Sequence, residues 1–418
     1  MKTIGRETHS IPLPLLEDAR DLHPNLRFCS DPTNAIMDFS NDLLNYTLSL
    51  LKGDPVLPPP VSLTEWRKLL SILRSHWVLP LLYWHIGRLP DEFCPPEPII
   101  DTMRTTFQWS RTRYFHMERQ LGEIVAAFKD EGVRILVLKG PALGRTIYPD
   151  AVLRPASDID LLVRPDEFMK ARKIFKRIDY QCKSKIFEVF KDFHREEEFI
   201  SRTDSRVMHS VDLHWDLHQF FGEKRGNKVE VIFQNAIEVK ASDLSFETMH
   251  PVDALINAAL HLIMHHNQDM RLIWVYDIAL LARSLVVPED WEMLQEKSSE
   301  WGARLAVEES LKLAQILTDL QVPKHFDNFS TWPKPAIDEL TCMNNAMAKG
   351  ENTDTLFNLL KGLYLSSSAK NFKKITYIFK LIFPDLDYMR HWYPRYNGLL
   401  LPLSYARRWW KWVKKPTS

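Results

Sequence analysis

Residues 157–163 read Ser-Asp-Ile-Asp-Leu-Leu-Val, and this stretch decides the fold. The alternation of Asp158, Ile159 and Asp160 on a strand would place both carboxylates on one face and the isoleucine in the core. Two adjacent carboxylates repel each other, whereas a divalent cation turns that repulsion into binding. Hard oxygen ligands of this kind favour Mg²⁺. The stretch predicts a strand that carries a metal site, although Asp-X-Asp also occurs by chance in turns and exposed strands.

A second short apolar run lies upstream of this strand. Residues 133–138 read Val-Arg-Ile-Leu-Val-Leu, follow Gly132 and end at Lys139 and Gly140. The β-branched and aliphatic composition predicts a strand that ends in a turn. A glycine turn exposes backbone N–H groups and the lysine adds a positive charge, so the turn is suited to phosphate. A lone Lys-Gly pair is weak evidence, and its place before the acidic strand gives it weight.

A third carboxylate lies downstream, in the sequence Val-Asp-Leu-His-Trp at 211–215. Alternation on a strand would place Asp212 and His214 on one face. From a neighbouring strand, Asp212 could bridge to the ion or accept the proton of an attacking hydroxyl. His214 could serve as a ligand, a phosphate donor or an orienting group. Without the upstream pair, Asp212 would be interpreted as a solvated strand acid.

The spacing of hydrophobic residues divides the rest of the chain into expected helices and strands. Ser62 and Glu65 have the spacing of a capping box, so a helix is expected from about 62, and another over 98–130. A helix over 166–179 and strands over 196–201 and 207–213 follow, and the helical period returns near 251. The prediction is an α+β fold, a small mixed sheet inserted between two helical regions. Its expected parts are a poorly structured lead-in (1–35), an N-terminal helical region (36–130), an α/β core (131–245), a C-terminal helical domain (246–398) and a basic aromatic tail (399–418).

Composition limits the partners of the chain. The 418 residues carry 54 basic and 54 acidic side chains, so no global field draws the molecule to nucleic acid. The four cysteines are far apart, which argues against a zinc site or a disulfide framework. No apolar run approaches the length of a signal peptide core or a membrane span. A soluble cytoplasmic protein is expected.

The tail from Leu399 to Lys415 mixes tryptophans with arginines and lysines. Such a segment suits the headgroup layer of a membrane, where it would make a peripheral contact at the inner surface. The alternative, which we favour, is a final helix that packs its tryptophans on the domain.

Another group of polar residues follows the predicted core. His261 and His265 have the i, i+4 spacing that lets two histidines on a helix hold a metal. The favoured interpretation is a buried polar network near Trp274, in which Asp277 orients a histidine or pairs with Arg271.

The order of the motifs resembles a known family, the bacterial "uncharacterised nucleotidyltransferase" family of the DNA polymerase β-like nucleotidyltransferase superfamily. The similarity extends from about 40 to about 290. The resemblance implies a small mixed sheet flanked by helices. The motifs that carry it are Val-Leu-Lys-Gly-Pro-Ala-Leu (137–143), Tyr-Pro-Asp (148–150), Arg-Pro (154–155), Ser-Asp-Ile-Asp-Leu-Leu-Val (157–163) and Val-Asp-Leu-His-Trp (211–215).

The resemblance also assigns roles to residues. Asp158 and Asp160 fall at the positions of the two metal-binding aspartates, and Asp212 at that of the third acid. Lys139 and Gly140 fall at the glycine turn that holds the nucleotide phosphates. The segment Leu260 to Leu281 resembles the helical region after the catalytic part and would form one wall of the substrate cleft.

One position departs from the superfamily pattern, which has Gly-Ser or Gly-Gly at the turn. Pro141 offers a phosphate neither a hydroxyl nor an N–H group. Phosphate contacts are therefore expected from Lys139, Arg145 or Arg154, with His214 nearby.

The expected reaction is transfer of a nucleoside monophosphate from an NTP to a hydroxyl of a small molecule, a sugar, or a peptide or protein. Asp158, Asp160 and Asp212 would hold two Mg²⁺ ions, with Mn²⁺ as the alternative. Nucleic acid is not expected as the acceptor, because the only dense basic and aromatic cluster is the distant tail. Two alternatives stay open: an inactive nucleotide-binding module, which Pro141 favours, and a peripheral membrane adaptor.

Overall fold

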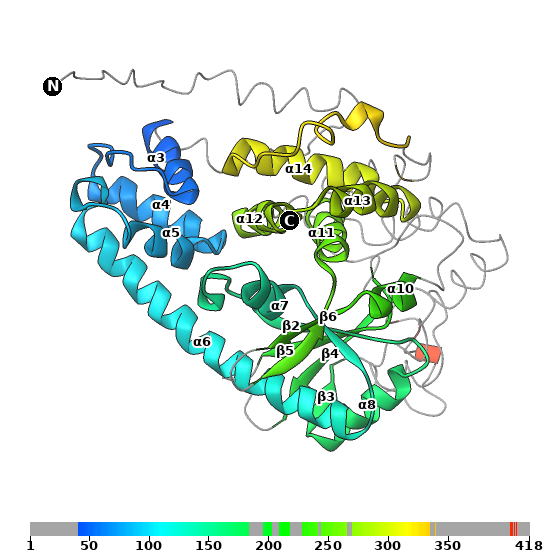
Figure 1. Cartoon of the computed structure of the whole chain (residues 1–418). Coiled ribbons are helices and arrows are strands. Elements are labelled where there is room, and N and C mark those ends of the chain that lie inside the picture. The colour runs from blue at the N-terminus through cyan, green and yellow to red at the C-terminus, as the bar shows by residue number, and fades with distance from the viewer. Residues whose placement is uncertain are drawn as a thin grey trace.

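The computed structural model describes residues 41–183, 195–202, 209–217, 228–240, 244–265, 270–334 and 339, with positions 402, 403, 405 and 407 near the C-terminus. These residues form a seven-stranded mixed sheet flanked by helices, which confirms the predicted α+β class (Figure 1). The expected lead-in and nearly all of the expected tail lie outside the described residues, so both stay predictions.

The sheet has the strand order β3-β4-β5-β2-β1-β7-β6. Two neighbouring pairs, β2 with β5 and β1 with β7, are parallel, and the other pairs are antiparallel. The strands predicted at 133–138, 158–163, 196–201 and 207–213 correspond to β1, β2, β4 and β5. The bounds are β1 Ile135–Leu138, β2 Asp158–Val163, β3 Tyr180–Cys182, β4 Glu196–Ser201, β5 Ser210–His214, β6 Ile237–Lys240 and β7 Ser245–Thr248.

Strand β2 lies near the middle of the sheet, between β1 and β5. Its residues from Ile159 to Val163 are all buried, which is the pattern of a strand covered on both faces. The first position, Asp158, is the only partly exposed one in β2. The apolar half of the strand therefore anchors it in the core and holds its acidic start at the edge of the sheet.

The N-terminal region is helical, with α3 (Asn41–Lys52), α4 (Leu63–Ser75), α5 (Leu79–Ile86) and the 34-residue α6 (Glu97–Asp130). Helix α4 begins with the predicted capping box, in which Ser62 and Glu65 each bond the other's backbone N–H. Helix α6 extends from α4 and α5 to the sheet (Figure 1). It therefore links the helical region and the sheet as one continuous rod.

The remaining helices lie between and after the strands. Figure 1 shows α11 to α14 grouped on the side of the sheet away from α8. A single π-helical turn, His261–His265, continues α11. The helices are α7 (Lys139–Thr146), α8 (Phe168–Arg177), α10 (Lys228–Gln234), α11 (Pro251–Leu260), α12 (Leu272–Ser284), α13 (Pro288–Glu300) and α14 (Arg304–Thr318), with 3-10 turns at Asp91–Phe93, Ala151–Leu153 and Phe329–Thr331.

Two apolar cores cover the two faces of the sheet. One contains buried residues of α3, α5, α11, α12 and α14 together with Leu136 and Leu162, so the helices before and after the sheet share a single core. The other joins the second half of α6 and α8 to Val137, Ile159 and Leu161. Because both faces are covered at the middle of the sheet, β1 is buried along its whole length and β2 is partly exposed only at its first residue, Asp158.

No described helix combines the length and apolar character needed to cross a membrane. No disulfide joins Cys94 and Cys182, while Cys29 and Cys342 lie outside the described residues.

Candidate active site

The three predicted acids come together at the start of β2. Asp160 of β2 and Asp212 of β5 are register partners on neighbouring parallel strands. Asp158 lies two residues before Asp160, and all three side chains line one cavity of about 230 Å³. The period-2 alternation of both strands thus places their carboxylates on one side of the sheet.

Asp160 lies at the centre of a chain of polar contacts. Its Oδ1 atom is 2.9 Å from Nζ of Lys139 and 3.0 Å from Nε2 of His214. The other ring nitrogen of His214, Nδ1, is 3.0 Å from Oε2 of Glu196. Glu196 was not predicted, and it reaches His214 because β4 and β5 pair these two residues in register.

The charged groups in this series of contacts stabilise one another. Burial alone would raise the pKa of Asp160, but the charge of Lys139 and the bond to His214 hold it well below its usual range. Burial opposes the charged form of His214, yet its bonds to Asp160 and Glu196 raise its pKa to about 9. His214 is therefore protonated at neutral pH and donates to a carboxylate from each ring nitrogen.

The other two acids are less compensated. Burial, followed by repulsion from Asp160, raises the pKa of Asp158 above its usual value. Burial, with repulsion from Asp160 and then Asp158, raises the pKa of Asp212 to about 7. Carboxylates that repel one another in a cavity are a donor set suited to a hard divalent cation.

The side chains as they stand do not converge on an ion. Within the described part of the chain, no three His, Cys, Asp or Glu side chains are close enough together to hold a metal. The Oδ1 atom of Asp160 is already bonded to Lys139 and His214. The donor chemistry of the three aspartates fits a divalent ion, and Lys139 and protonated His214 provide the positive charge at Asp160 in this arrangement.

Strand β1 leads directly into α7 through a sharp backbone turn at Lys139, the first residue of the helix, and this junction is held close to the loop before β2. A Cβ atom on Gly140 would lie 2.6 Å from Cβ of Ala156 and 3.2 Å from Nη1 of Arg154, so only glycine fits. Lys139 has a φ of 45°, a left-handed conformation that strains a residue with a side chain by about 1 kcal/mol. The turn places the lysine beside the carboxylates.

The two predicted phosphate arginines lie in different places. Arg145 forms an ion pair with Glu118 of α6 and does not line the carboxylate cavity. Arg154 lines the cavity, but its Nη2 atom is 2.8 Å from Oδ2 of Asp277. Asp277 also accepts a 2.7 Å hydrogen bond from Tyr148.

This pairing corrects the expectation for Asp277. It was expected to orient a histidine or to pair with Arg271, and it instead pairs with Arg154, 123 residues away in the chain. Both side chains are buried, at 6% and 3% exposure. The ion pair ties the loop before β2 to α12.

Aromatic and basic side chains form the opposite wall of the cavity. The Arg271 guanidinium lies between two indoles, 4.2 Å from the ring centre of Trp77 and 5.0 Å from that of Trp274. The ring of His261 meets Trp274 edge-on at 4.9 Å. His261, Arg271 and Trp274 all belong to the segment that was expected to form a wall, whereas Trp77 was not predicted.

The predicted histidine pair is only partly described. The π-helical turn carries His261 to the cavity, and such turns are frequent at functional sites. Nothing is described of the His265 side chain, so a metal held by this pair stays a prediction.

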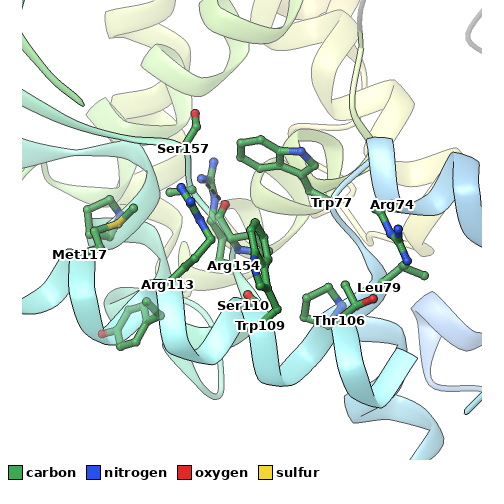
Figure 2. A pocket seen from close by; sticks show the side chains of 15 residues that line it. Arg74, Trp77, Leu79, Thr106, Trp109, Ser110, Arg113, Met117, Arg154 and Ser157 are labelled. Carbon is green, nitrogen blue, oxygen red and sulfur yellow. Dashed lines mark hydrogen bonds between the residues drawn. The ribbon is translucent and has the colours of Figure 1, made fainter. Parts of the chain in front are cut away.

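A second, mostly apolar cavity of about 360 Å³ adjoins the first (Figure 2). Trp77, Arg154 and Ser157 line both cavities. Pro141 lines the second cavity and does not line the carboxylate cavity. The ring that lacks an N–H group is therefore part of an apolar wall.

Comparison with known proteins gives one family match. A family described as "Uncharacterised nucleotidyltransferase" matches residues 62–319, which is more than half of the chain. No curated protein matches the chain. Among solved structures, the solution structure of the antibiotic-resistance factor ANT(2'')-Ia is similar, with 12% identity and a TM-score of 0.32 over 45% of this chain and 96% of that one. That similarity is too low to support an argument.

Proposed function

This chain belongs to the uncharacterised nucleotidyltransferase family, and from that premise we propose that it transfers a nucleoside monophosphate from an NTP to a hydroxyl group at the carboxylate cavity. The observation that carries the proposal is the convergence of Asp158, Asp160 and Asp212 from two neighbouring strands on one cavity. The acceptor is a small molecule, a sugar, or a peptide or protein, and pyrophosphate is the leaving group.

Asp158, Asp160 and Asp212 would hold Mg²⁺, with Mn²⁺ as the alternative. When bound, the metal supplies positive charge that activates the hydroxyl and neutralises the phosphates. Asp212 has no hydrogen-bond partner in the described part of the chain, and we assign it to accept the proton of the attacking hydroxyl or to bridge.

We assign the triphosphate to two cations. Lys139 is 2.9 Å from Asp160, so a phosphate beside the carboxylates lies within its reach. Arg271, held between Trp77 and Trp274, supplies a planar donor on the opposite wall. Arg271 takes the place expected for Arg145, which is paired with Glu118 outside the cavity.

The position of Pro141 supports the active form of this proposal over an inactive nucleotide-binding module. Pro141 suggested the inactive alternative because it cannot donate to a phosphate. Since Pro141 lines the neighbouring cavity, it takes no donor away from the carboxylate cavity.

Product analysis tests the proposal. The protein would be incubated with each of the four NTPs, MgCl₂ or MnCl₂, and a metabolite and peptide extract, and the products separated and weighed by mass spectrometry. We expect one or more compounds to gain the mass of one nucleoside monophosphate, with stoichiometric pyrophosphate and complete loss in EDTA. Folded protein that yields neither product nor pyrophosphate with any NTP would contradict the proposal.

A further inference from the structure

The second cavity lies between the N-terminal helices and the loop before β2. Figure 2 shows Thr106, Trp109 and Ser110 along α6, with Trp77 above them. Leu79 and Met117 add apolar surface, so the lining is largely hydrocarbon and aromatic. A ligand in this cavity would be held mainly by apolar and ring contacts.

The hydroxyl groups around this cavity already donate to protein oxygens. Thr106 donates to the carbonyl of Thr102 at 3.0 Å, and Ser110 to that of Val152 at 3.2 Å. The Tyr114 hydroxyl donates to Glu118 at 2.9 Å. The cavity therefore offers few donors besides its arginines and indoles.

The charges of this cavity are all positive. Arg74, Arg113 and Arg154 line it, and no acidic side chain does. Arg154 is neutralised by Asp277. Arg74 and Arg113 form no ion pair with any carboxylate in the described residues, and the Arg113 guanidinium lies 4.9 Å from the Trp109 ring centre. Two uncompensated guanidinium groups favour a ligand group that only accepts hydrogen bonds.

The second cavity borders the carboxylate cavity. Ser157 lines both cavities, and its hydroxyl donates to Oδ2 of Asp158 at 3.0 Å. A ligand in the second cavity that contacts Ser157 therefore has one end beside Asp158.

We propose that the second cavity binds the acceptor, and that this acceptor is a hydroxylated molecule with an apolar ring-bearing body and a carboxylate. The inference rests on the proposed function for its chemistry. The acceptor oxygen forms a bond to the α-phosphorus of the NTP, and the bond from that phosphorus to the bridging oxygen breaks. Pyrophosphate leaves, and the hydroxyl proton passes to Asp212 and then to solvent.

A nucleobase is the competing occupant. A neutral nucleobase carries no negative charge to match Arg74 and Arg113, whereas a carboxylate accepts charge-assisted hydrogen bonds from them. The carboxylate is therefore the better match, and the nucleobase is an outcome that the test distinguishes.

Binding without NTP tests the inference by isothermal titration. The probes are salicylate, para-hydroxyphenylpropionate and hydroxynaphthoate, each compared with its primary amide. We expect at least one acid to bind about tenfold more tightly than its amide, since a charge-assisted bond contributes about that factor. If no acid of the panel binds in preference to its amide, the inference is wrong.

Matched variants locate the probe. Arg113→Met should weaken the preferred acid about tenfold, while Arg111→Met, on the same helix but outside the lining, should leave it unchanged. Thr106→Phe fills the cavity and should abolish binding, whereas Thr105→Phe, which is exposed, should not.

The same variants separate the alternatives. If Thr106→Phe leaves acid binding intact, or abolishes binding of a non-hydrolysable ATP analogue instead, the acceptor inference is overturned. If the acid binds as expected but no NTP yields a nucleotidylated acid, the proposed reaction is contradicted and the binding site is still supported.

Discussion

Asp160 of β2 and Asp212 of β5 are direct neighbours across two parallel strands. Their side chains lie on the same side of the sheet and line the same cavity as Asp158. The carboxylates are therefore fixed by backbone hydrogen bonding, which gives a rigid site.

Gly140→Ala should destabilise the protein by about 1–3 kcal/mol and reduce turnover, because the new methyl group would lie 2.6 Å from Cβ of Ala156. The double variant Gly140→Ala with Ala156→Gly should recover most of both losses. Denaturant unfolding and product formation measure the two effects. Gly122→Ala is the control, because Gly122 lies within helix α6 and its new Cβ would be 3.9 Å from the nearest atom, in the side chain of Leu244. This variant should stabilise the protein by about 0.5–1 kcal/mol. Failure of the double variant to recover stability would contradict the steric explanation.

Asp277→Asn should lower the free energy of unfolding by about 3–5 kcal/mol, because it leaves the guanidinium of Arg154 buried without a counter-charge. Lys183→Met removes an exposed, solvent-screened ion pair with Glu198 and should leave the free energy of unfolding nearly unchanged. Urea unfolding of both variants measures the difference, and equal effects would show that the Arg154–Asp277 pair carries no special weight.

His209 should make the protein less stable in acid. Burial, followed by the charges of Arg113 and His116, lowers the pKa of His209 from 6.5 to about 4. Its two ring nitrogens have no hydrogen-bond partner. The unfolded chain therefore takes up a proton near pH 6.5 that the folded chain binds only near pH 4. The contribution of neutral His209 to the free energy of unfolding is complete above pH 6.5 and is lost as the pH falls toward 4.

Replacing His209 tests this sign. Between neutral pH and about pH 4, the free energy of unfolding of His209→Leu should fall by up to about 3 kcal/mol less than that of the wild-type protein. His116→Gln, on a partly exposed side chain, should keep the loss. Unfolding free energies across this pH range measure the effect, and an unchanged acid limb in His209→Leu would contradict it.

Lys139→Met should make the carboxylates bind Mn²⁺ about tenfold more tightly in the absence of nucleotide. The ammonium group lies 2.9 Å from Asp160 and competes with an added cation for the same oxygen. Turnover should fall about a hundredfold, because the triphosphate loses a positive charge. Titration followed by electron paramagnetic resonance measures metal affinity separately from activity. Lys170→Met, at an exposed position of α8, should change neither, and an unaltered Mn²⁺ affinity in Lys139→Met would rule out the competition.

The residues that could be predicted are those whose place depends on local pattern. Strand alternation placed Asp158 and Asp160 on one face, and the spacing of Ser62 and Glu65 located the start of α4. Lys139 was located because a turn follows a short apolar strand.

The missed residues depend on contacts between distant elements. Glu196 reaches the site through the register of β4 against β5. Trp77 lies in the turn between α4 and α5, before the sheet in sequence, and Arg271 lies directly before α12, after the sheet. No local period encodes strand order or the docking of one helix on another. Arg154 was expected at a phosphate because its nearest charge, Asp277, lies 123 residues away in the chain.

The most direct test of the central claim is Asp212→Asn, measured for both NTP-dependent product formation and thermal unfolding midpoint. Turnover should fall at least about a hundredfold, since the substitution removes a carboxylate from the reaction site. The midpoint should stay the same or rise, because the repulsion between Asp212 and Asp160 is relieved. Glu198→Gln is the control, since Glu198 pairs with Asp212 in register but does not line the cavity, and it should keep wild-type turnover. A folded Asp212→Asn protein with undiminished turnover would contradict the account.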